Sequence, residues 1–144
     1  MEPKIEVRRV SDADKLEQVF AIRRKVFVDE QNCPPELEWE YEDESVHFLG
    51  SVNGIPAAAS RWRKTANGYK LERFAVLKEF RGIGMGQALV AAVLKDLPAD
   101  AEYIYLHAQI AAMPLYAKFG FKEAGEQFEE AGIQHFKMEL ICRL

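Results

Sequence analysis

The sequence predicts an α/β protein built on one mixed sheet, and three observations support this class. Segments with the period-two or aromatic-rich patterns of strands outnumber those with helical periodicity. Asn53-Gly54 separates two such strand segments, and this dipeptide is typical of a tight antiparallel hairpin. A helical segment at 86–97 lies between two further strand segments, which predicts a crossover between parallel strands.

The first half of the chain contains a strand, a long helix and a hairpin. Ser11 and Asp12 are good N-cap residues, and apolar residues at helical spacing follow them. The next segment is interrupted by prolines and is rich in acidic residues, which indicates a loop. We therefore expect a strand at 4–10, a helix at 11–31, a loop at 32–45 and a hairpin of strands 46–52 and 55–64.

The second half alternates strands with two helices before a final pair of strands. Gly120 suits the position that ends a helix, and Gly132 suits a turn between two strands. We expect strands at 69–76, 101–108, 121–128 and 133–141, with helices at 86–97 and 111–120. The chain would then form a mixed sheet of seven strands flanked by helices.

The composition limits the class of protein. A chain of 144 residues suits a single domain over 1–144. Its net charge of −4 argues against nucleic-acid binding, and its longest apolar run is far too short to cross a membrane. Without a signal-peptide pattern, and with only Cys33 and Cys142, we expect reduced thiols in a cytoplasmic protein. The three histidines are scattered, so we expect no metal site.

Three glycines stand between the strand at 69–76 and the helix that follows it. The stretch reads "FRGIGMGQALVAAVL" and contains Gly82, Gly84 and Gly86 directly after Arg81. The free N–H groups of a first helical turn bind anions, and glycine lets a phosphate approach the backbone. The spacing fits neither a P-loop nor a dinucleotide fingerprint but does fit R-x-x-G-x-G. An ordinary helix N-terminus is the alternative.

The R-x-x-G-x-G pattern and its neighbours resemble the GNAT superfamily of acyl-coenzyme A-dependent N-acetyltransferases. "LERFAVLKEFRGIGMG" is similar to the family's strand and pyrophosphate loop, and "QIAAMPLYAKFGF" is similar to its second motif. Lys78 stands where the family often has proline, and Gln109 stands where many members carry asparagine. "RRKVFVDEQ" and "AGIQHFKM" look like the small ElaA-like bacterial branch. The resemblance covers nearly the whole chain and implies a GNAT-like fold with a mostly antiparallel sheet.

The resemblance also implies the reaction and the cofactor site. Acetyl-coenzyme A would be the cosubstrate, and a primary amine would attack it directly through a tetrahedral intermediate. The pantetheine chain would pair with Phe74 and Val76 like an extra strand, next to a gap that begins near Ala108 and Gln109. A backbone N–H near Val76 would bind the oxyanion. The implied cofactor-binding residues are Phe74, Ala75, Val76, Arg81, Gly82, Ile83, Gly84, Met85, Gly86, Gln87, Gln109 and Tyr116.

Two side chains are candidates for proton transfer. The resemblance gives Tyr116 the role of acid for the leaving thiolate, and packing in the core is the alternative. Glu72 is the candidate base, because period two would place it on one strand face with Phe74 and Val76. The alternative for Glu72 is a salt bridge to a neighbour such as Arg61 or Arg73. A histidine or water could then be the base, and an acceptor that binds as the neutral amine would need none.

The acceptor site is less well defined by the sequence. Candidate substrate-binding residues are Arg23, His47, Arg61 and His135. Six carboxylates lie between Glu36 and Glu44, together with Trp39 and Tyr41. This acidic run could attract a cationic acceptor, but a solvated loop is the simpler interpretation.

Three functions remain open at this stage. The main prediction is an N-acetyltransferase that acts on a small primary amine. One alternative is a catalytically silent module of the same fold that binds acyl-coenzyme A as a sensor. Another is acetylation of a protein N-terminus or lysine, which would require an open groove. We expect a monomer or a homodimer, with the C-terminal strands as the available sheet edge.

Overall fold

A computed structural model describes residues 3–34 and 42–141 of the chain, and seven strands form one sheet. The strands are β1 (Ile5–Val10), β2 (Ser45–Val52), β3 (Ile55–Lys64), β4 (Tyr69–Val76), β5 (Tyr103–Gln109), β6 (Lys122–Glu130) and β7 (Ile133–Ile141). The helical segments are α1 (Ala13–Arg23), η1 (Arg24–Glu30), η2 (Glu42–Glu44), η3 (Lys78–Phe80), α3 (Met85–Asp96), η4 (Ile110–Ala112) and α4 (Met113–Ala117).

The strand order is β1-β2-β3-β4-β5-β7-β6, and β4–β5 is the parallel pair among otherwise antiparallel neighbours. The predicted mixed, mostly antiparallel sheet is thus confirmed. Asn53 and Gly54 have φ values of 52° and 81°, which is the conformation that a tight hairpin turn requires. The parallel pair is joined through α3, as the crossover pattern predicted.

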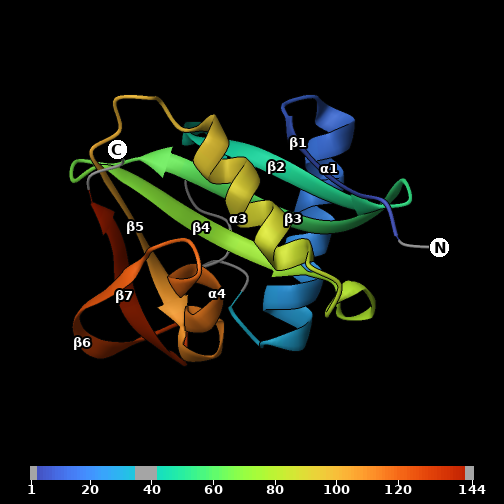
Figure 1. The fold of residues 1–144 in the computed structure, drawn as a ribbon. Helices are drawn as coiled ribbons and strands as arrows, with labels where there is room; N and C mark the ends of the chain where they lie inside the picture. The colour runs from blue at the N-terminus through green and yellow to red at the C-terminus, as the bar shows by residue number, and fades with distance from the viewer. Residues whose placement is uncertain (1–2, 35–41, 142–144) are drawn as a thin grey trace.

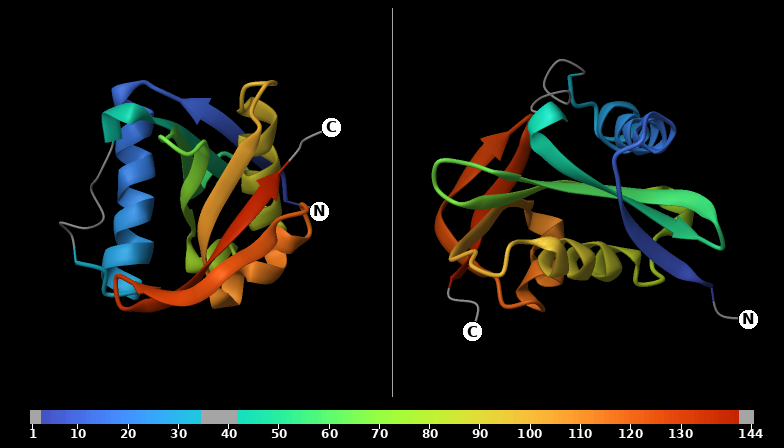
Figure 2. Two further views of the ribbon diagram at one scale, coloured as in Figure 1. Left: turned by 90° about the vertical axis from the view of Figure 1, so that its left-hand side faces the viewer. Right: turned by 90° about the horizontal axis from the view of Figure 1, so that it is seen from above.

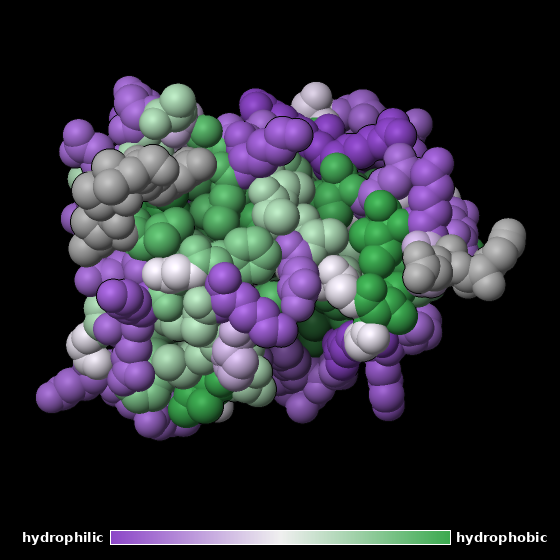
Figure 3. Space-filling view, viewed as in Figure 1, coloured by the Kyte–Doolittle hydropathy of each residue, from purple (hydrophilic) through white to green (hydrophobic). Residues whose placement is uncertain are grey.

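Helices cover both faces of the sheet. Figure 1 shows α3 crossing the front of the sheet with α4 below it, while α1 lies behind. The view from above in Figure 2 separates α1 and α3 into two layers with the sheet between them. Val19 and Ile22 of α1 pack on one face, and Val90 and Val93 of α3 pack on the other. Seen from the α3 side, polar side chains surround an apolar middle (Figure 3).

The predicted helix at 11–31 is present but changes its geometry halfway. Asp12 caps it, because its carboxylate accepts the backbone N–H of Lys15 at 3.2 Å. The α-helix ends at Arg23 and continues as the π-helix η1. π-Helical turns are rare in proteins, but those that occur are often found at functional sites. The wider turn carries Phe27 and Gln31 toward the middle of the sheet.

A bulge in β4 changes which residues face each helix layer. Ala75 lies opposite Ala59 and Glu72 lies opposite Arg61, so two β4 residues stand against the single residue Ser60. Arg73, inside this bulge, has a φ of 58°, which is strained for a residue with a side chain. Directly opposed residues share a face, so Glu72 shares the face of Ala75. The prediction that Glu72 shares a face with Phe74 and Val76 is therefore wrong.

The sheet divides next to this bulge. β4 and β5 pair only at their first residues, and the last pair is Leu71 with Leu106. β5 remains paired with β7 as far as Gln109, opposite His135. The gap between β4 and β5 thus opens at Glu72 and His107, slightly earlier than the expected start at Ala108 and Gln109. No helix among the described residues is long and apolar enough to span a membrane.

The left-handed backbone at Arg73 makes a testable prediction about stability. Both Arg73→Gly and Arg73→Val remove the guanidinium, so their difference reports the backbone. In an ordinary strand valine is the better residue. Here we expect the glycine variant to be more stable than the valine variant by about 1–2 kcal/mol, because a branched side chain is strained at this φ. Urea denaturation measures this difference, and a more stable valine variant would contradict the bulge.

Candidate active site

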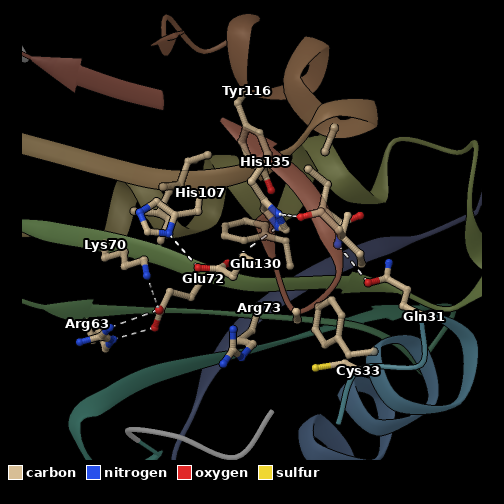
Figure 4. Close-up of a pocket in the computed structure, with 18 residues that line it drawn as sticks. Gln31, Cys33, Arg63, Lys70, Glu72, Arg73, His107, Tyr116, Glu130 and His135 are labelled. Carbon is tan, nitrogen blue, oxygen red and sulfur yellow. Dashed lines mark hydrogen bonds and ion pairs between the residues drawn. The ribbon is translucent and has the colours of Figure 1, made fainter. Parts of the chain in front are cut away.

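A cavity of about 430 Å³ occupies the gap where β4 and β5 separate, and we call it the split pocket. Its lining comes from η1, the end of β3, β4, β5, α4 and the β6–β7 turn (Figure 4). On the α3 side the lining is apolar, with Leu71, Phe74 and Leu106. On the α1 side it is polar, because alternation turns Glu72 and His107 that way. The pocket therefore joins two chemically different faces of the sheet.

A second hollow of about 510 Å³ lies at the start of α3, and we call it the loop groove. Arg81, Gly82, Gly84 and Gly86 line it, together with Val76 and Leu115. Gln31, Phe74 and Ala112 line both cavities. The loop groove and the split pocket are therefore adjacent and share these three residues as a border.

The three glycines of the loop are required for different reasons. Gly82 and Gly84 have φ values of 82° and 93°, which glycine adopts without strain. An added Cβ at either would meet nothing within 4 Å, so both border open space. A Cβ at Gly86 would lie 3.2 Å from Leu115 Cδ2, so close packing of α3 against α4 is a separate reason for that glycine. Gly86 also lines the loop groove, so this packing is a reason in addition to the predicted phosphate site.

The other residues of the predicted cofactor set lie in and around the groove. Met85 is in the lining of the groove and is 1% exposed, because it packs in the core beneath α3. The side chain of Ala75 packs toward α1, and Ile83 and Gln87 are exposed and are not part of either lining. Gln109 lines the split pocket and donates a hydrogen bond to Gln31 Oε1 at 3.0 Å.

Arg81 already has an anionic partner. Its two terminal nitrogens each lie 2.8 Å from an oxygen of Glu30, and its Nε donates to the Val76 carbonyl at 2.9 Å. The hydrogen bond to Glu30 raises the pKa of the Arg81 guanidinium above its usual value. Any anion that binds Arg81 with the same geometry must displace the Glu30 carboxylate.

Tyr116 of α4 reaches the split pocket from the apolar side. Its ring packs edge-on against Phe74 at 5.8 Å and near Phe121 at 6.2 Å. Its side chain points into the pocket in Figure 4. Burial raises the pKa of the phenol above its usual value, so the hydroxyl stays protonated at neutral pH. The core packing given as the alternative for Tyr116 is thus present, and its role as an acid stays a prediction that its place in the pocket lining allows.

Glu72 is held by three cations on the polar side. Arg61 and Arg63 approach Oε1 at 2.9 and 2.8 Å, and Lys70 approaches Oε2 at 3.1 Å. Burial by itself would raise the pKa of Glu72, but the Arg63 hydrogen bond and the nearby charges outweigh it and lower the pKa to about 2. The salt-bridge alternative is thus present, with Arg61 as a partner. A carboxylate with so low a pKa is a weak base, which disfavours the catalytic role predicted for Glu72.

A buried network between α1 and the sheet contains Arg23, His47 and Arg61. None of these three residues is part of the pocket lining. Arg23 and Arg61 are 1% and 0% exposed and both bind the carboxylate of Glu42. The ring of His47 lies 3.0 Å from the Glu42 carbonyl, and burial lowers its pKa. Contact of these three side chains with a substrate is not supported, because the protein itself surrounds them.

The acidic run is not wholly solvated. Glu42 is part of this network and ties the loop to α1 and β3. Burial opposes its charge, but Arg23 and Arg61 keep the pKa of Glu42 below its usual value. Glu36, Glu38, Trp39, Glu40 and Tyr41 lie outside the described residues.

His135 is the predicted substrate-binding residue that the structure does place in the split pocket. Near it lie His107 and Glu130, which the sequence analysis did not select. Lys70 and Arg73 also line the pocket and were not selected. No local pattern marks Glu130, because the β6–β7 turn alone brings it to the end of β5. Glu130 can therefore be assigned to the pocket from the strand topology but not from its neighbours in the sequence.

The surroundings of Glu72 predict a structural role that can be separated from catalysis. The lowered pKa means that the folded state favours the carboxylate. Glu72 therefore adds stability above about pH 4.5, and this is lost as pH falls toward 2. We expect Glu72→Gln to cost about 3–5 kcal/mol near neutral pH. Urea denaturation between pH 7 and pH 3 should show the penalty shrinking with acid.

Glu6→Gln is the matched control, because Glu6 pairs with Lys4 and Arg8 on the surface of β1. Because this pair is exposed to solvent, the variant should unfold at nearly the same urea concentration as the wild type. A Glu72→Gln variant that is as stable as the wild type but inactive would restore Glu72 as a base.

Comparisons with known proteins agree with this geometry. A sequence model of the acetyltransferase (GNAT) domain matches residues 10–142. The uncharacterized N-acetyltransferase YjcF of Bacillus subtilis is 40% identical over 129 residues, which cover 87% of this chain and 91% of YjcF. The crystal structure of Escherichia coli ElaA matches with a TM-score of 0.83 at 29% identity. The match covers 94% of this chain and 99% of the ElaA chain.

A Bacillus subtilis acetyltransferase solved in complex with CoA has the same fold, with a TM-score of 0.69 at 17% identity. That alignment covers 97% of this chain and 100% of the other. The domain match spans nearly the whole chain, and the sheet divides between β4 and β5 beside a glycine loop that the sequence had already singled out. On these grounds the chain belongs to the GNAT family and is an acetyltransferase.

Proposed function

We propose that this enzyme transfers an acetyl group from acetyl-coenzyme A to the primary amine of a small molecule. The observation that carries the proposal is that the loop groove and the split pocket lie side by side and share Phe74 in their linings. One cavity begins at a helix N-terminus suited to anions, and the other ends among ionisable side chains. A donor and an acceptor that enter from the two ends would meet beside Phe74.

The residues of the loop groove fit the diphosphate and pantetheine parts of coenzyme A. Gly84 is the N-cap of α3, and the backbone N–H groups of the first turn are available to an anion. Within 3–34 and 42–141, no residue pairs with β4 on its β5 side beyond Leu71, so Phe74 and Val76 offer a strand edge to an extended chain. A relative by fold that was solved with CoA supports the same ligand.

The chemistry at the meeting point needs an oxyanion donor and an acid. When bound, acetyl-coenzyme A supplies a thioester whose carbonyl carbon accepts the amine. A backbone N–H near Val76 would stabilise the oxyanion. The Tyr116 hydroxyl, which stays protonated, would give its proton to the departing sulfur. A cavity of about 430 Å³ suits a small amine better than a protein surface.

Thermal unfolding with acetyl-coenzyme A tests binding, and release of the free thiol tests turnover. A ligand at roughly a hundred times its Kd adds about 2.7 kcal/mol, which should raise Tm by roughly 5–10 °C. ATP and NADH at the same concentration are controls for general phosphate binding. A panel of small primary amines then tests transfer. No shift with acetyl-coenzyme A would contradict the proposal, as would a shift without thiol release for any amine.

Tyr116→Phe is the catalytic arm of the same experiment. It removes one hydroxyl and keeps the ring contacts with Phe74 and Phe121. We expect the thermal shift to be retained and kcat to fall about a hundredfold or more. A variant with the wild-type kcat would remove Tyr116 from the mechanism.

The Glu30–Arg81 ion pair predicts competition with the donor. Since Glu30 occupies the guanidinium of Arg81, Glu30→Gln should tighten the binding of acetyl-coenzyme A by about two- to fivefold. Glu79→Gln removes the same charge from an exposed residue near Arg81 and is the matched control. Isothermal titration calorimetry measures both affinities. Equal affinities for the two variants would show that Glu30 does not compete.

A further inference from the structure

The ring of His135 has its tautomer fixed by the backbone. Its Nδ1 lies 2.7 Å from the carbonyl oxygen of Ile133, two residues earlier in β7. A carbonyl oxygen can only accept, so Nδ1 carries the hydrogen. In the neutral ring the lone pair is then on Nε2. The ring is 6% exposed, stacks on Phe128 at 5.8 Å and lines the split pocket.

A carboxylate stands beside this nitrogen. Glu130 Oε2 lies 3.8 Å from His135 Nε2, too far for a hydrogen bond but close enough to stabilise a positive charge. The other oxygen of Glu130 accepts a hydrogen bond from Nδ1 of His107 at 3.1 Å, which holds the carboxylate in place. That bond lowers the pKa of Glu130, so it stays ionised. Among the described residues, Nε2 of His135 has no hydrogen-bond partner.

We propose that His135 is the catalytic base, which removes a proton from the acceptor amine through Nε2, with Glu130 and His107 as positioning residues. This inference rests on the proposed function, because it assumes transfer to an amine in the split pocket. It assigns to the β6–β7 hairpin a chemical role in addition to its place in the sheet.

The step balances in atoms and electrons. The acceptor ammonium gives one proton to Nε2, and the freed lone pair forms the C–N bond to the thioester carbon. The C–S bond breaks, its electron pair leaves with sulfur, and sulfur takes the proton of Tyr116. Of the two protons lost by nitrogen, one replaces that of Tyr116 and the other leaves His135 for solvent. The products are an amide, a thiol and one proton.

The other ionisable groups around the pocket are less suited to this task. The other ionisable side chains that line the pocket with His135 are Cys33 after η1, Arg63 of β3, Lys70, Glu72 and Arg73 of β4, His107 of β5, Tyr116 of α4 and Glu130 of β6. Glu72 has a pKa of about 2 and is held by three cations. His107 is bound to Glu130, and Glu130 is itself a weak base. Arg63, Lys70 and Arg73 have side chains that donate and do not accept, and Cys33 donates to the Pro34 carbonyl. Burial raises the pKa of the Tyr116 phenol, so its hydroxyl is a donor as well.

The key variant is His135→Asn. The asparagine amide can donate to the Ile133 carbonyl as Nδ1 does, so the contact of the hairpin is kept while Nε2 is removed. If His135 only supports the turn, His135→Asn should behave as the wild type. If it is the base, kcat should fall about a hundredfold or more with Tm nearly unchanged. A His135→Ala variant loses both the hydrogen bond to the Ile133 carbonyl and the Nε2 base. The fall in its Tm shows what that hydrogen bond contributes to stability.

Two probe amines separate base catalysis from positioning. Benzylamine is almost fully protonated at neutral pH, whereas hydroxylamine is mostly neutral and needs no base before attack. We expect His135→Asn to lose transfer to benzylamine and to keep most transfer to hydroxylamine. The acid limb of kcat/KM for benzylamine should also change in the variant, since imidazole is the side chain that changes charge between about pH 5 and 8. Equal losses for both amines would overturn the base role.

Nitrogen NMR of the histidine rings tests the tautomer without activity. Long-range correlations in uniformly labelled protein should show His135 with the hydrogen on Nδ1, and His135→Asn identifies its signals by their loss. A hydrogen on Nε2 at neutral pH would overturn the inference. Wild-type protein that acetylates neither probe would refute the proposed function and the base with it. Wild-type transfer with an unimpaired His135→Asn variant would refute the base alone.

Discussion

The left-handed backbone of Arg73 is the constraint on which the rest of the site depends. It inserts one residue into β4, so Glu72 and Phe74 point to opposite faces although they are two residues apart. Pairing between β4 and β5 ends at Leu71, directly before this bulge. The strained residue thus lies where the sheet opens, as strained backbone often does in functional sites. Without it, Phe74 and Val76 could not face the glycine loop while Glu72 faces the polar side.

The buried charges stabilise the polar side of the opening. Arg61 bridges Glu72 of β4 and Glu42 of η2, and Glu42 in turn binds Arg23 of α1. Removing one member would leave a buried charge without its partner, which is costly. These residues therefore fix the positions of α1 and β4 around the split pocket. The catalytic roles that we propose belong instead to Tyr116 and His135, which also border the cavity.

The sequence predicted what depends on local patterns. The hairpin at Asn53-Gly54, the crossover through α3 and the glycine loop after Arg81 follow from turn chemistry and periodicity. The sheet face to which Glu72 points was not predicted correctly, because strict alternation assumes a regular strand and nothing in "LERFAV" marks a bulge. The pairing of Arg61 with Glu72 was given as an alternative, but the binding of Arg23 and Arg61 to Glu42 was missed, because ion pairing across a fold depends on distant residues. Glu130 reaches the pocket only through the topology of the last two strands.

Residue-resolved amide hydrogen exchange, with and without acetyl-coenzyme A, tests the central claim most directly. That claim is that the donor adds to the free edge of β4 and places its phosphates on the α3 N-terminus. The account predicts slower exchange at the amides of 74–76 and 84–87, with little change in β1 and β2. Unchanged exchange in both segments, or protection confined to another part of the sheet, would contradict it.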